Sequence, residues 1–451
     1  MAEGIDLRGK RVLVVGLART GVATAKFLKT RGATVSTTEM KTREEMGAAV
    51  REVEAVAVRS EWGGHRTQTF LGQDLVVMSP GVDLKIDPVQ DALKRGIPVI
   101  SEVELAYRFL EAPIVAVTGT NGKTTTTLLI GEMLKEAGKA VGVGGNVGEP
   151  LILFAEGPGR WDVVVAEISS FQLEAVELFR PRLSVLLNVT EDHLDRYGRY
   201  EDYIEAKARV FMNQTPEDLA VVNRDDSIVR KIGKGVKAKA FFFSLQEELQ
   251  EGAFRHDQGI RLRLMGKEED YPLAKARLKG IHNVENMMAA ILTARLLGCP
   301  QEAVERALSG FEGLEHRLEF VRGIGGVRFF NDSKGTNVGS VVKSLGSFSE
   351  PVILIAGGKD KRTDLGPLHD LIRERVKRLI LIGEAKGRMA RELGGLTDTV
   401  MAGTLEEAVR LAYETARGGD VVLLSPACSS YDMFRDYKER GEVFKEAVRR
   451  L

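Results

Sequence analysis

The sequence repeats one local pattern along its length: a short apolar run, a turn that contains glycine, and then a stretch with helical periodicity. The first copy runs from Val12–Val15 through Gly16–Gly21 into a helical stretch that reaches Thr30, and Ala33–Thr37 follows as the next predicted strand. Strands that alternate with helices are typical of doubly wound parallel sheets. The chain is therefore predicted to be an α/β protein whose ligands bind beyond the carboxyl ends of its strands. Further copies begin at Ile114–Thr118, Val163–Ala166, Val185–Asn188, Val352–Ile355, Leu379–Ile382 and Val421–Leu424.

Two breaks divide this pattern into parts. A domain holds about 150 residues on average, so a chain of 451 residues is expected to form about three domains. The first break lies near Leu110–Pro113, before a new strand, loop and helix. The second lies near Gly313–His316, before a strand series that opens at Val327–Phe330. We therefore expect three domains, at residues 1–110, 111–314 and 315–451.

Composition excludes several classes of protein. Lys+Arg and Asp+Glu both total 64, and a non-specific nucleic-acid binder would need a basic excess to release counterions, so no nucleic-acid partner is expected. The two cysteines, Cys299 and Cys428, make no disulfide framework and no Cys-x-x-Cys metal site, which fits a reducing compartment. The N-terminus lacks the apolar stretch of a signal peptide, and no apolar run approaches the ~20 residues of a membrane span. We expect a cytoplasmic protein without a membrane partner.

The strongest local signal is Val115–Thr125, in which an apolar strand runs into a glycine-rich turn and a helix then begins at Lys123. Glycines let backbone N–H groups approach phosphate oxygens, Lys123 can reach the terminal phosphates, and the Thr124 hydroxyl can bind Mg²⁺. The general phosphate-loop spacing would place glycine where Val117 stands, so this loop is a variant. A glycine-rich turn without a ligand is the alternative. The predicted ATP-contacting residues of the loop are Gly119, Thr120, Asn121, Gly122, Lys123, Thr124 and Thr125.

Candidate metal ligands follow at the ends of the next two predicted strands. Glu167 ends an apolar strand, and His193 comes shortly after the following one. Each residue has a simpler reading, because Glu167 could cap a turn and His193 could be an ordinary polar loop residue. A phosphate-loop enzyme needs a carboxylate for its Mg²⁺, and the carboxyl ends of neighbouring strands meet at one edge of a sheet. We therefore expect both residues to lie beside the phosphate loop.

The N-terminal turn Gly16–Gly21 resembles a dinucleotide-binding fingerprint, but Ala18 replaces its middle glycine. Glu39 stands at the distance expected for a ribose-binding carboxylate, so a dehydrogenase would be the first interpretation. The missing glycine weakens that interpretation, since the pyrophosphate must lie against the backbone there. A phosphate loop downstream also has no place in hydride transfer. A tight turn that serves packing alone is a further alternative.

Six motifs, in this order along the chain, resemble those of the Mur ligases of peptidoglycan synthesis, and the resemblance covers essentially the whole sequence. Within that family the branch that adds D-glutamate looks most similar, because of Gly145–Gly148, the Phe-Gln-Leu-Glu that ends at Glu174, and Ser425–Asp432. The six motifs are Thr118–Thr125, Glu167–Glu174, Asn188–Tyr197, His282–Asn286, Glu315–Glu319 and Asn331–Asn337.

The resemblance implies an N-terminal Rossmann-like domain for a UDP-linked substrate, a central ATPase domain with a parallel sheet, and a C-terminal Rossmann-like domain that helps to bind an amino acid. It implies two Mg²⁺ ions, one held by Thr124 and Glu167 and the other by His193 and a carbamylated lysine. The matching lysine is Lys207. The spacing from His193 to Lys207 is one residue shorter than expected, and an ordinary lysine on a solvated helix face is the alternative.

The resemblance also assigns the remaining contacts. Asn286, Arg317 and Asp332 would bind the adenine and ribose of ATP, with Asn283 beside them. Arg19, Thr20, Glu39, Lys41, Gly81 and Asn146 would bind the UDP part of the substrate. Lys334, Thr336, Lys361, Ser430 and Tyr437 would bind D-glutamate. Lys359 and Arg362 stand beside Lys361 and are alternatives for the same role, as is a solvated charged loop. Cys428 has no histidine motif near it and is expected to be structural.

The implied reaction activates a carboxylate with ATP and then joins it to an amine. The substrates would be UDP-N-acetylmuramoyl-L-alanine and D-glutamate, and Lys123, His193 and Lys207 would be the catalytic residues, in a protein that we expect to be a monomer. Two alternatives stay open. One is a sibling ligase, either another Mur ligase or a folylpolyglutamate synthase. The other is a non-catalytic, nucleotide-dependent binding module, which the presence of Lys123, Glu167, His193 and Lys207 disfavours.

Overall fold

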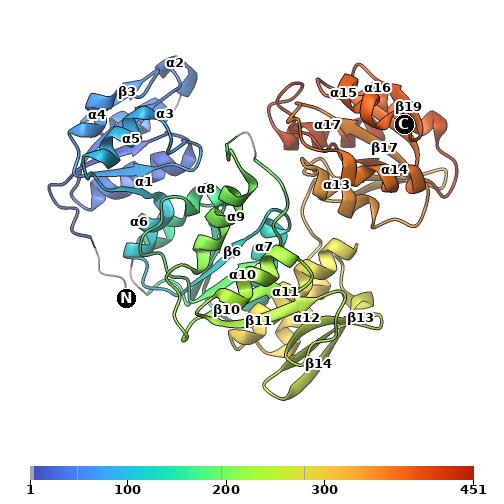
Figure 1. The fold of residues 1–451 in the computed structure, drawn as a ribbon, viewed down its shortest axis with the longest axis horizontal. Helices are drawn as coiled ribbons and strands as arrows, with labels where there is room; N and C mark the ends of the chain where they lie inside the picture. The colour runs from blue at the N-terminus through green and yellow to red at the C-terminus, as the bar shows by residue number, and fades with distance from the viewer. Residues whose placement is uncertain (1–4, 48, 158, 194–195, 279) are drawn as a thin grey trace. The chain divides into compact units, whose positions relative to one another are not determined.

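The structure, a computed structural model, describes residues 5–47, 49–157, 159–193, 196–278 and 280–451, which form three sheets with their helices (Figure 1). By compactness the chain divides into two units. The described residues within Met1–Val189, Arg196–Tyr271 and Met287–Ala307 form the first unit. Those within Thr190–Asp195, Pro272–Asn286 and Leu308–Leu451 form the second.

The first sheet has five strands in the order β3-β2-β1-β4-β5, and all of its strand pairs are parallel. Strands β1 and β4 are short runs of apolar residues, which allows them to be buried in the middle of the sheet. The strands are β1 (Arg11–Val15), β2 (Thr34–Glu39), β3 (Arg59–Trp62), β4 (Leu75–Met78) and β5 (Val99–Ser101). The helices are α1 (Arg19–Thr30), α2 (Arg43–Met46), α3 (Ala49–Glu54), α4 (Thr67–Leu71), α5 (Asp87–Lys94) and α6 (Glu102–Phe109).

The second sheet has nine strands in the order β14-β13-β12-β11-β10-β9-β6-β8-β7. Pairing is parallel from β7 to β12 and antiparallel between β12 and β13. The strands are β6 (Ile114–Thr118), β7 (Val141–Gly145), β8 (Val163–Glu167), β9 (Leu183–Leu186), β10 (Leu219–Asn223), β11 (Lys239–Ser244), β12 (Gly252–His256), β13 (Gly259–Leu264) and β14 (Lys267–Pro272). The helices are α7 (Lys123–Glu136), α8 (Ser170–Leu173), α9 (Tyr200–Ala208), α10 (Ser227–Gly235), α11 (Ile281–Leu296) and α12 (Gln301–Gly310), with 3₁₀ turns η1 (Leu151–Ala155), η2 (Arg209–Phe211) and η3 (Leu273–Lys275).

The third sheet has six strands in the order β15-β16-β20-β17-β18-β19, with only β15 antiparallel to its neighbour. Alternate residues of β17 enter different cores: Leu354 packs with α13, α14 and α15, whereas Ile353 packs with α16 and α17. The sheet is therefore covered on both faces, as a doubly wound fold requires. The strands are β15 (Glu319–Ile324), β16 (Val327–Asn331), β17 (Val352–Gly357), β18 (Val376–Ile382), β19 (Asp398–Met401) and β20 (Val421–Leu424). The helices are α13 (Val338–Leu345), α14 (His369–Arg375), α15 (Lys386–Leu393), α16 (Leu405–Thr415) and α17 (Tyr437–Arg449), with the 3₁₀ turn η4 (Gly366–Leu368).

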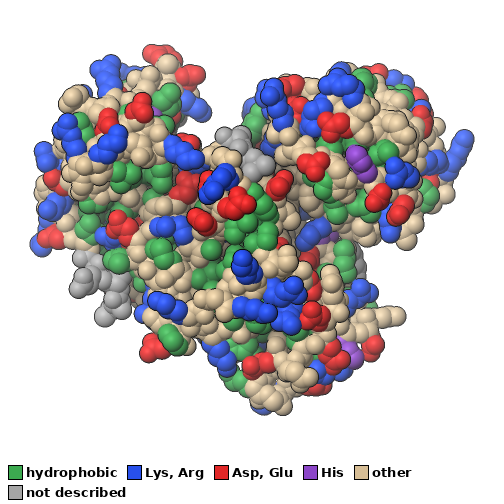
Figure 2. Space-filling model, in the orientation of Figure 1, with side chains coloured by type: hydrophobic (Ala, Val, Ile, Leu, Met, Phe, Trp, Pro, Cys, Tyr) green, Lys and Arg blue, Asp and Glu red, His purple; other side chains and the backbone are tan. Residues whose placement is uncertain are grey.

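The predicted three-part α/β fold with parallel sheets is confirmed, with two departures. Strands β12–β14 extend the second sheet with a segment that includes an antiparallel pair, and the third sheet opens with β15, before the predicted start at Val327. The boundaries at residues 110 and 314 stay predictions. Among the described residues no helix is both long and apolar enough to cross a bilayer. Basic and acidic side chains are interspersed over the face in Figure 2, as the formal net charge of zero leads one to expect.

Candidate active site

The turn between β6 and α7 has the geometry of a phosphate-binding loop. Gly119 and Gly122 both have positive φ, 148° and 85°, and Gly122 caps the N-terminus of α7. A Cβ on Gly119 would lie 3.1 Å from the Leu187 Cβ, so glycine fits closely there. Lys123 Nζ donates to the carbonyl oxygens of Gly119 and Thr120, each at 2.9 Å, which folds its ammonium back over the loop. The loop therefore presents backbone N–H groups, a helix N-terminus and a cation to one small region, which suits an anion.

Asn188, which follows β9, anchors the loop from the side. Its side-chain Oδ1 accepts from Asn121 N at 2.8 Å, its Nδ2 donates to Asn121 O at 3.1 Å, and its backbone O accepts from Thr120 N at 2.9 Å. The Asn188 side chain is thus bonded to both backbone groups of Asn121, which fixes the shape of the loop. Sequence reasoning gave this residue no role, although it opens the motif that contains His193.

Thr124 and Glu167 converge at the carboxyl edge of the second sheet. Glu167 is the last residue of β8, which pairs directly with β6, so its side chain lies beside the phosphate loop. Thr124 Oγ1 donates to Glu167 Oε2 at 2.6 Å, and Asn146 Nδ2 donates to Glu167 Oε1 at 2.7 Å. The predicted juxtaposition of Glu167 with the loop is therefore present. A hydroxyl and a carboxylate are ligands that Mg²⁺ prefers, so this pair fits a magnesium site.

Lys207 lies inside the protein, on α9. Its side chain is 1% exposed, Nζ donates to the Gly119 carbonyl oxygen at 2.8 Å, and Nζ lies 4.5 Å from the centre of the Tyr203 ring. Tyr203 in turn shares a hydrogen bond of 3.1 Å with the Thr120 hydroxyl. The alternative of a lysine on a solvated helix face is therefore wrong, since Lys207 contacts the phosphate loop from within the core.

His193 lies in the other compact unit, in a backbone conformation with a positive φ of 56°. Its backbone N donates to Asp192 Oδ1 at 3.0 Å, and its Nε2 lies 3.8 Å from Asp192 Oδ2. Its imidazole is about two-fifths exposed, so the ring is accessible. Its place as a metal ligand stays a prediction.

The six residues predicted to bind the UDP part of the substrate all line one cavity of about 1060 Å³. The N-terminal glycine turn forms part of its wall: Gly16 has a φ of 85°, and a Cβ on Gly21 would lie 1.9 Å from the Gly16 carbonyl oxygen. Glu39 closes the turn, because its carboxylate accepts from Leu17 N at 2.6 Å and from Lys41 N at 3.1 Å. A turn that serves packing alone would not need such a cavity. The six residues are Arg19, Thr20, Glu39, Lys41, Gly81 and Asn146.

The residues predicted to contact adenine and ribose are mostly buried in the second unit. Asn283 and Asn286 lie near the start of α11, and Asn286 Nδ2 donates to Asn283 Oδ1 at 3.2 Å. Asp332 follows β16 and is deeply buried, which raises its pKa to about 6. Its Oδ2 accepts from the hydroxyls of Ser344 and Ser425, each at 2.7 Å. Asp332 thus also fastens α13 and β20 to the strand end that carries it.

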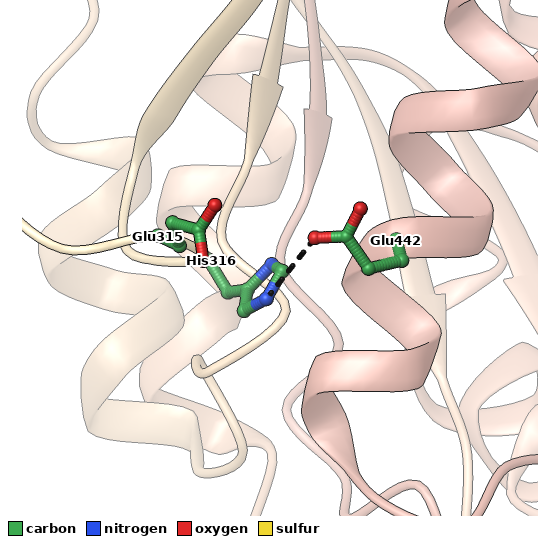
Figure 3. Close-up of side chains that lie close together, drawn as sticks. All are labelled: Glu315, His316 and Glu442. Atoms are coloured by element: carbon green, nitrogen blue, oxygen red, sulfur yellow. Dashed lines mark ion pairs between the residues drawn. The ribbon is translucent and has the colours of Figure 1, made fainter.

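His316, beside the predicted nucleotide contact Arg317, belongs to a buried polar network. Glu315 and Glu442 approach its ring (Figure 3), which invites a metal-site interpretation. Asn331 argues against it. Ser333 N donates to Asn331 Oδ1 at 3.1 Å, so the Asn331 amide nitrogen is the group that faces His316 Nδ1, at 2.9 Å.

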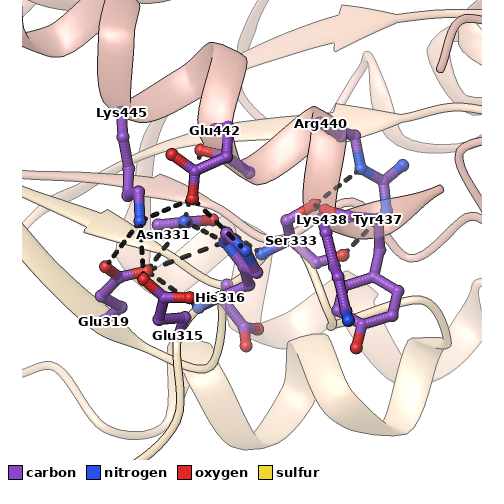
Figure 4. A network of polar contacts seen from close by, with 12 residues as sticks. Glu315, His316, Glu319, Asn331, Ser333, Tyr437, Lys438, Arg440, Glu442 and Lys445 are labelled. Atoms are coloured by element: carbon purple, nitrogen blue, oxygen red, sulfur yellow. Dashed lines mark hydrogen bonds and ion pairs between the residues drawn. The ribbon is translucent and has the colours of Figure 1, made fainter. Parts of the chain in front are cut away.

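His316 Nδ1 must therefore accept, which leaves the ring proton on Nε2, the atom that faces Glu442 at 3.6 Å. Burial also lowers the pKa of His316, which keeps the ring neutral. Lys445 Nζ lies 2.7 Å from Glu442 Oε1 and 3.3 Å from Glu315 Oε1, so the carboxylates already have a cation (Figure 4). We assign this cluster to the support of the connection that carries Arg317.

The residues predicted to bind the amino acid come from separate turns of the third sheet. Lys334 follows Asp332, and its Nζ lies 3.8 Å from the centre of the ring of Tyr437, the first residue of α17. Ser430, 2% exposed, lies in the turn after β20. Thr336 N donates to the Lys334 carbonyl oxygen at 2.8 Å. Burial raises the pKa of the neighbouring Cys428 thiol to about 11, as expected for a structural cysteine.

The structure distinguishes the three cationic residues of the charged loop after β17. Lys361 Nζ lies 3.7 Å from Asp192 Oδ1, and its side chain is 24% exposed. Lys359 instead pairs with Glu384 at 2.6 Å, where both side chains are about half exposed. Arg362 has a positive φ of 53° and donates its backbone N to Asp360. Lys361 is therefore less exposed than Lys359 and is not a purely solvated residue, and which of the three contacts the amino acid stays a prediction.

Comparison with known proteins identifies the family. Sequence models of three domains match in order: a Mur ligase MurD-like N-terminal domain at residues 10–101, a Mur ligase middle domain at residues 117–294, and a Mur ligase glutamate ligase domain at residues 316–428. The chain belongs to the Mur ligase family. Two relatives named UDP-N-acetylmuramoylalanine--D-glutamate ligase, from Geotalea daltonii and Geobacter metallireducens, are 53% and 52% identical to this Mur ligase over 447 residues, with 99% of each chain covered.

Solved structures of other Mur-type ligases share the fold. A pseudomurein peptide ligase type C from Methanothermus fervidus superposes with a TM-score of 0.61 at 18% identity, covering 98% of this chain and all of the other. MurF from Acinetobacter baumannii superposes with a TM-score of 0.62 at 17% identity, covering 91% and 90%. At such low identity the likeness concerns the fold alone. The Mur ligase fold is thus supported both by sequence and by shape.

Proposed function

We propose that this Mur ligase uses ATP to join D-glutamate to the carboxylate of UDP-N-acetylmuramoyl-L-alanine through an acyl phosphate. The relatives that are 49–53% identical over 99% of the chain bear the name of this activity. The main structural support for the use of ATP is that Thr124 Oγ1 and Glu167 Oε2 lie 2.6 Å apart beside the phosphate loop. These two side chains offer oxygen ligands for a metal ion where the terminal phosphates of ATP would lie.

Phosphoryl transfer would depend on the loop. An oxygen of the substrate carboxylate attacks the γ-phosphorus, the bond from that phosphorus to the β,γ-bridging oxygen breaks, and ADP leaves. Lys123 would neutralise charge on the phosphoryl oxygens and let two anions meet, and Gly119–Thr125 would hold the phosphates through backbone N–H groups. The amine of D-glutamate then attacks the acyl carbon, loses a proton, and displaces inorganic phosphate. Alignment of the reactants is the main contribution of the protein.

Thr124 and Glu167 would hold one Mg²⁺, and His193 with a carbamylated Lys207 would hold a second. When bound, Mg²⁺ supplies Lewis-acid stabilisation of charge on the phosphoryl oxygens. A carbamate forms when a neutral amine attacks CO₂, and the contact of Lys207 with the phosphate loop, at 1% exposure, supports a role for this residue beside the proposed metal site. The motif match to the family carries the assignment of His193.

Substrate contacts would be divided among the remaining residues. Asn283, Asn286, Arg317 and Asp332 would contact the adenosine of ATP. The six residues of the N-terminal cavity would bind the UDP part of the substrate, a role that the volume of about 1060 Å³ supports. Lys334, Thr336, Lys361, Ser430 and Tyr437 would bind D-glutamate, since a dicarboxylate needs cations and hydrogen-bond donors.

Phosphate release tests the proposal. The purified protein is given ATP, Mg²⁺ and UDP-N-acetylmuramoyl-L-alanine with D-glutamate, L-glutamate or meso-diaminopimelate as the amine. In a separate arm a folate replaces UDP-N-acetylmuramoyl-L-alanine as the carboxylate, with L-glutamate as the amine. We expect release with D-glutamate and at least about a hundredfold slower release with L-glutamate, because inversion leaves polar groups of the pocket unpaired. A preference for another acceptor would make the protein a sibling ligase, and ATP binding without release under any condition would make it a binding module. Size-exclusion chromatography checks the expected monomer.

A further inference from the structure

The side chain of Arg440, on helix α17, is completely buried and ties two separate turns of the third sheet together. Its side chain is 0% exposed. Nε donates to Ser333 Oγ at 3.0 Å, and Nη2 donates to the Ser333 carbonyl oxygen at 2.8 Å and to the Cys428 carbonyl oxygen at 3.1 Å. Nη1 donates to the Ser429 carbonyl oxygen at 3.3 Å. Figure 4 shows Arg440 beside Ser333. One guanidinium thus bridges the turn after β16 and the turn after β20.

These two turns are the ones that carry predicted acceptor contacts. Lys334 comes directly after Ser333, and Ser430 directly after Ser429. Every group that Arg440 contacts is therefore at most two residues from a side chain proposed to bind D-glutamate. Tyr437, a third such residue, lies one helical turn before Arg440 on α17, and its carbonyl oxygen accepts from Ser333 Oγ at 2.7 Å. The guanidinium lies at the centre of this arrangement without being exposed to solvent.

The hydrogen bonds of the Arg440 guanidinium indicate that it holds the two turns in position and does not neutralise a carboxylate. Within the part of the chain that the structure describes, no carboxylate comes within ion-pair distance of Arg440, and three of its four acceptors are backbone carbonyls. A buried cation without a carboxylate is costly, and a planar guanidinium can satisfy several carbonyls in fixed directions that an ammonium cannot reach. Gly358 leaves room for it, since a Cβ there would lie 3.1 Å from Nη1.

We propose that Arg440 is a positioning residue for the acceptor pocket, which sets the spacing of the turn that carries Lys334 and the turn that carries Ser430. This inference rests on the proposed function, because it takes those residues to bind D-glutamate. Arg440 itself touches no substrate. Without the Arg440 side chain the two turns would move independently, and the affinity for the amino acid would fall. The phosphate loop and the N-terminal cavity lie in the other compact unit and would keep their geometry.

The test is a comparison of Michaelis constants in the full-length enzyme. Arg440→Lys keeps the positive charge but cannot reach four acceptors from one nitrogen. We expect it to raise the KM for D-glutamate at least tenfold and to leave the KM for UDP-N-acetylmuramoyl-L-alanine, whose proposed contacts lie in the other compact unit, within about threefold. Ser333→Ala removes the Oγ that accepts from Arg440 and donates to the Tyr437 carbonyl oxygen, and it should raise the same KM by at least about threefold. It decides the question if Arg440→Lys does not fold.

Lys445→Met is the matched control. Lys445 is also a buried cation on α17, 5% exposed, but it pairs with Glu315, Glu319 and Glu442 instead of the pocket turns. The Lys445→Met variant should have a lower thermal stability than wild type, and its KM for D-glutamate should stay within about twofold of the wild-type value. An unchanged KM for D-glutamate in both pocket variants, or an equal rise in the KM for D-glutamate and the KM for UDP-N-acetylmuramoyl-L-alanine, would overturn the role of Arg440. If the wild-type enzyme releases phosphate only with a different amino acid, the assignment of D-glutamate as the acceptor is overturned instead. The same variants would then be measured with that amino acid.

Discussion

Thr124 Oγ1 lies 2.6 Å from Glu167 Oε2, although 43 residues separate the two in the sequence. The parallel pairing of β6 with β8 produces this contact, since it brings the turn after one strand to the end of the other. A hydroxyl and a carboxylate at this distance can share one hard cation. Asn146, from the N-terminal cavity, donates to the other oxygen of the same carboxylate, so the proposed metal ligand also touches the proposed substrate site.

Glu167→Gln should therefore change the dependence on magnesium more than the fold. Glutamine keeps the size of the side chain and an oxygen that can accept from Asn146, but it removes the negative charge. We expect the Mg²⁺ concentration for half-maximal phosphate release to rise at least about tenfold, which corresponds to roughly 1.4 kcal/mol. The exposed Glu177 serves as a control, and Glu177→Gln should leave the magnesium titration unchanged. Equal magnesium titrations for Glu167→Gln and wild type would contradict the metal assignment.

Lys123→Ala should fold and lose ligation. Lys123 is the partly exposed first residue of α7, and its ammonium donates to two carbonyl oxygens of the phosphate loop, so its removal leaves the core intact. Loss of a cation that stabilises the transferring phosphoryl group costs about 3 kcal/mol or more, or at least a hundredfold in kcat. Circular dichroism and thermal melting check the fold, and phosphate release checks the rate. A well-folded variant with near-normal turnover would refute the phosphate-loop assignment.

Lys207→Ala should be nearly inactive if Lys207 is carbamylated, with partial recovery when acetate or formate fills the space. A bare ammonium would repel a second Mg²⁺, whereas a carbamate offers oxygen ligands. Labelled bicarbonate and ¹³C nuclear magnetic resonance detect the carbamate directly, and Lys239→Ala, at an exposed lysine, is the control. Full activity of wild type in CO₂-depleted buffer, together with no carbamate signal, would exclude the modification.

The alternation of apolar runs and helical stretches was enough to predict the three parallel sheets, because period and turn residues are local properties of the sequence. It did not predict the strands β12–β14, because β14 is largely polar and exposed and because β12 and β13 mix apolar residues with arginines. Nor did it predict β15 at the edge of the third sheet, where Glu319 and Arg322 interrupt the apolar residues. Edge strands carry a weak signal because only part of their surface is buried.

For the candidate site, compact motifs predicted that Glu167 lies beside the turn that contains Gly119 and Lys123, and the structure places it there. The roles of these residues stay predictions. Arg440 carries no such signal, since an arginine in the polar sequence of α17 reads as a solvated residue, and only the fold shows that its side chain is 0% exposed. The different surroundings of Lys361 and Lys359 likewise depend on ion pairs with carboxylates that are distant in the sequence.

Two buried glutamates on α6 give a last prediction, because their carboxylates differ in the number of groups that donate to them. Glu104 is 0% exposed, and its carboxylate accepts from Arg108 Nε at 2.8 Å and from the backbone N–H of Phe179 at 2.9 Å, among others. Glu102 is 1% exposed, accepts from Ile152 N at 2.7 Å, and its Oε2 has no hydrogen-bond partner among the described residues. Burial raises the pKa of Glu102 from 4.5 to about 7.

A carboxyl group whose pKa is raised on folding stabilises the fold fully below its unfolded pKa, and that stability is lost as pH rises through the folded value. Wild type should therefore lose roughly 3 kcal/mol between pH 4.5 and pH 8 through Glu102, and Glu102→Gln, which stays neutral, should not. Urea unfolding should show the variant more stable than wild type at pH 8 and equal to it near pH 4.5. Glu104→Gln should instead be less stable at pH 8, by about 1–3 kcal/mol, because an amide nitrogen would face groups that donate to the carboxylate. Equal stability of Glu102→Gln and wild type at pH 8 would show that Glu102 is not the source of the pH dependence.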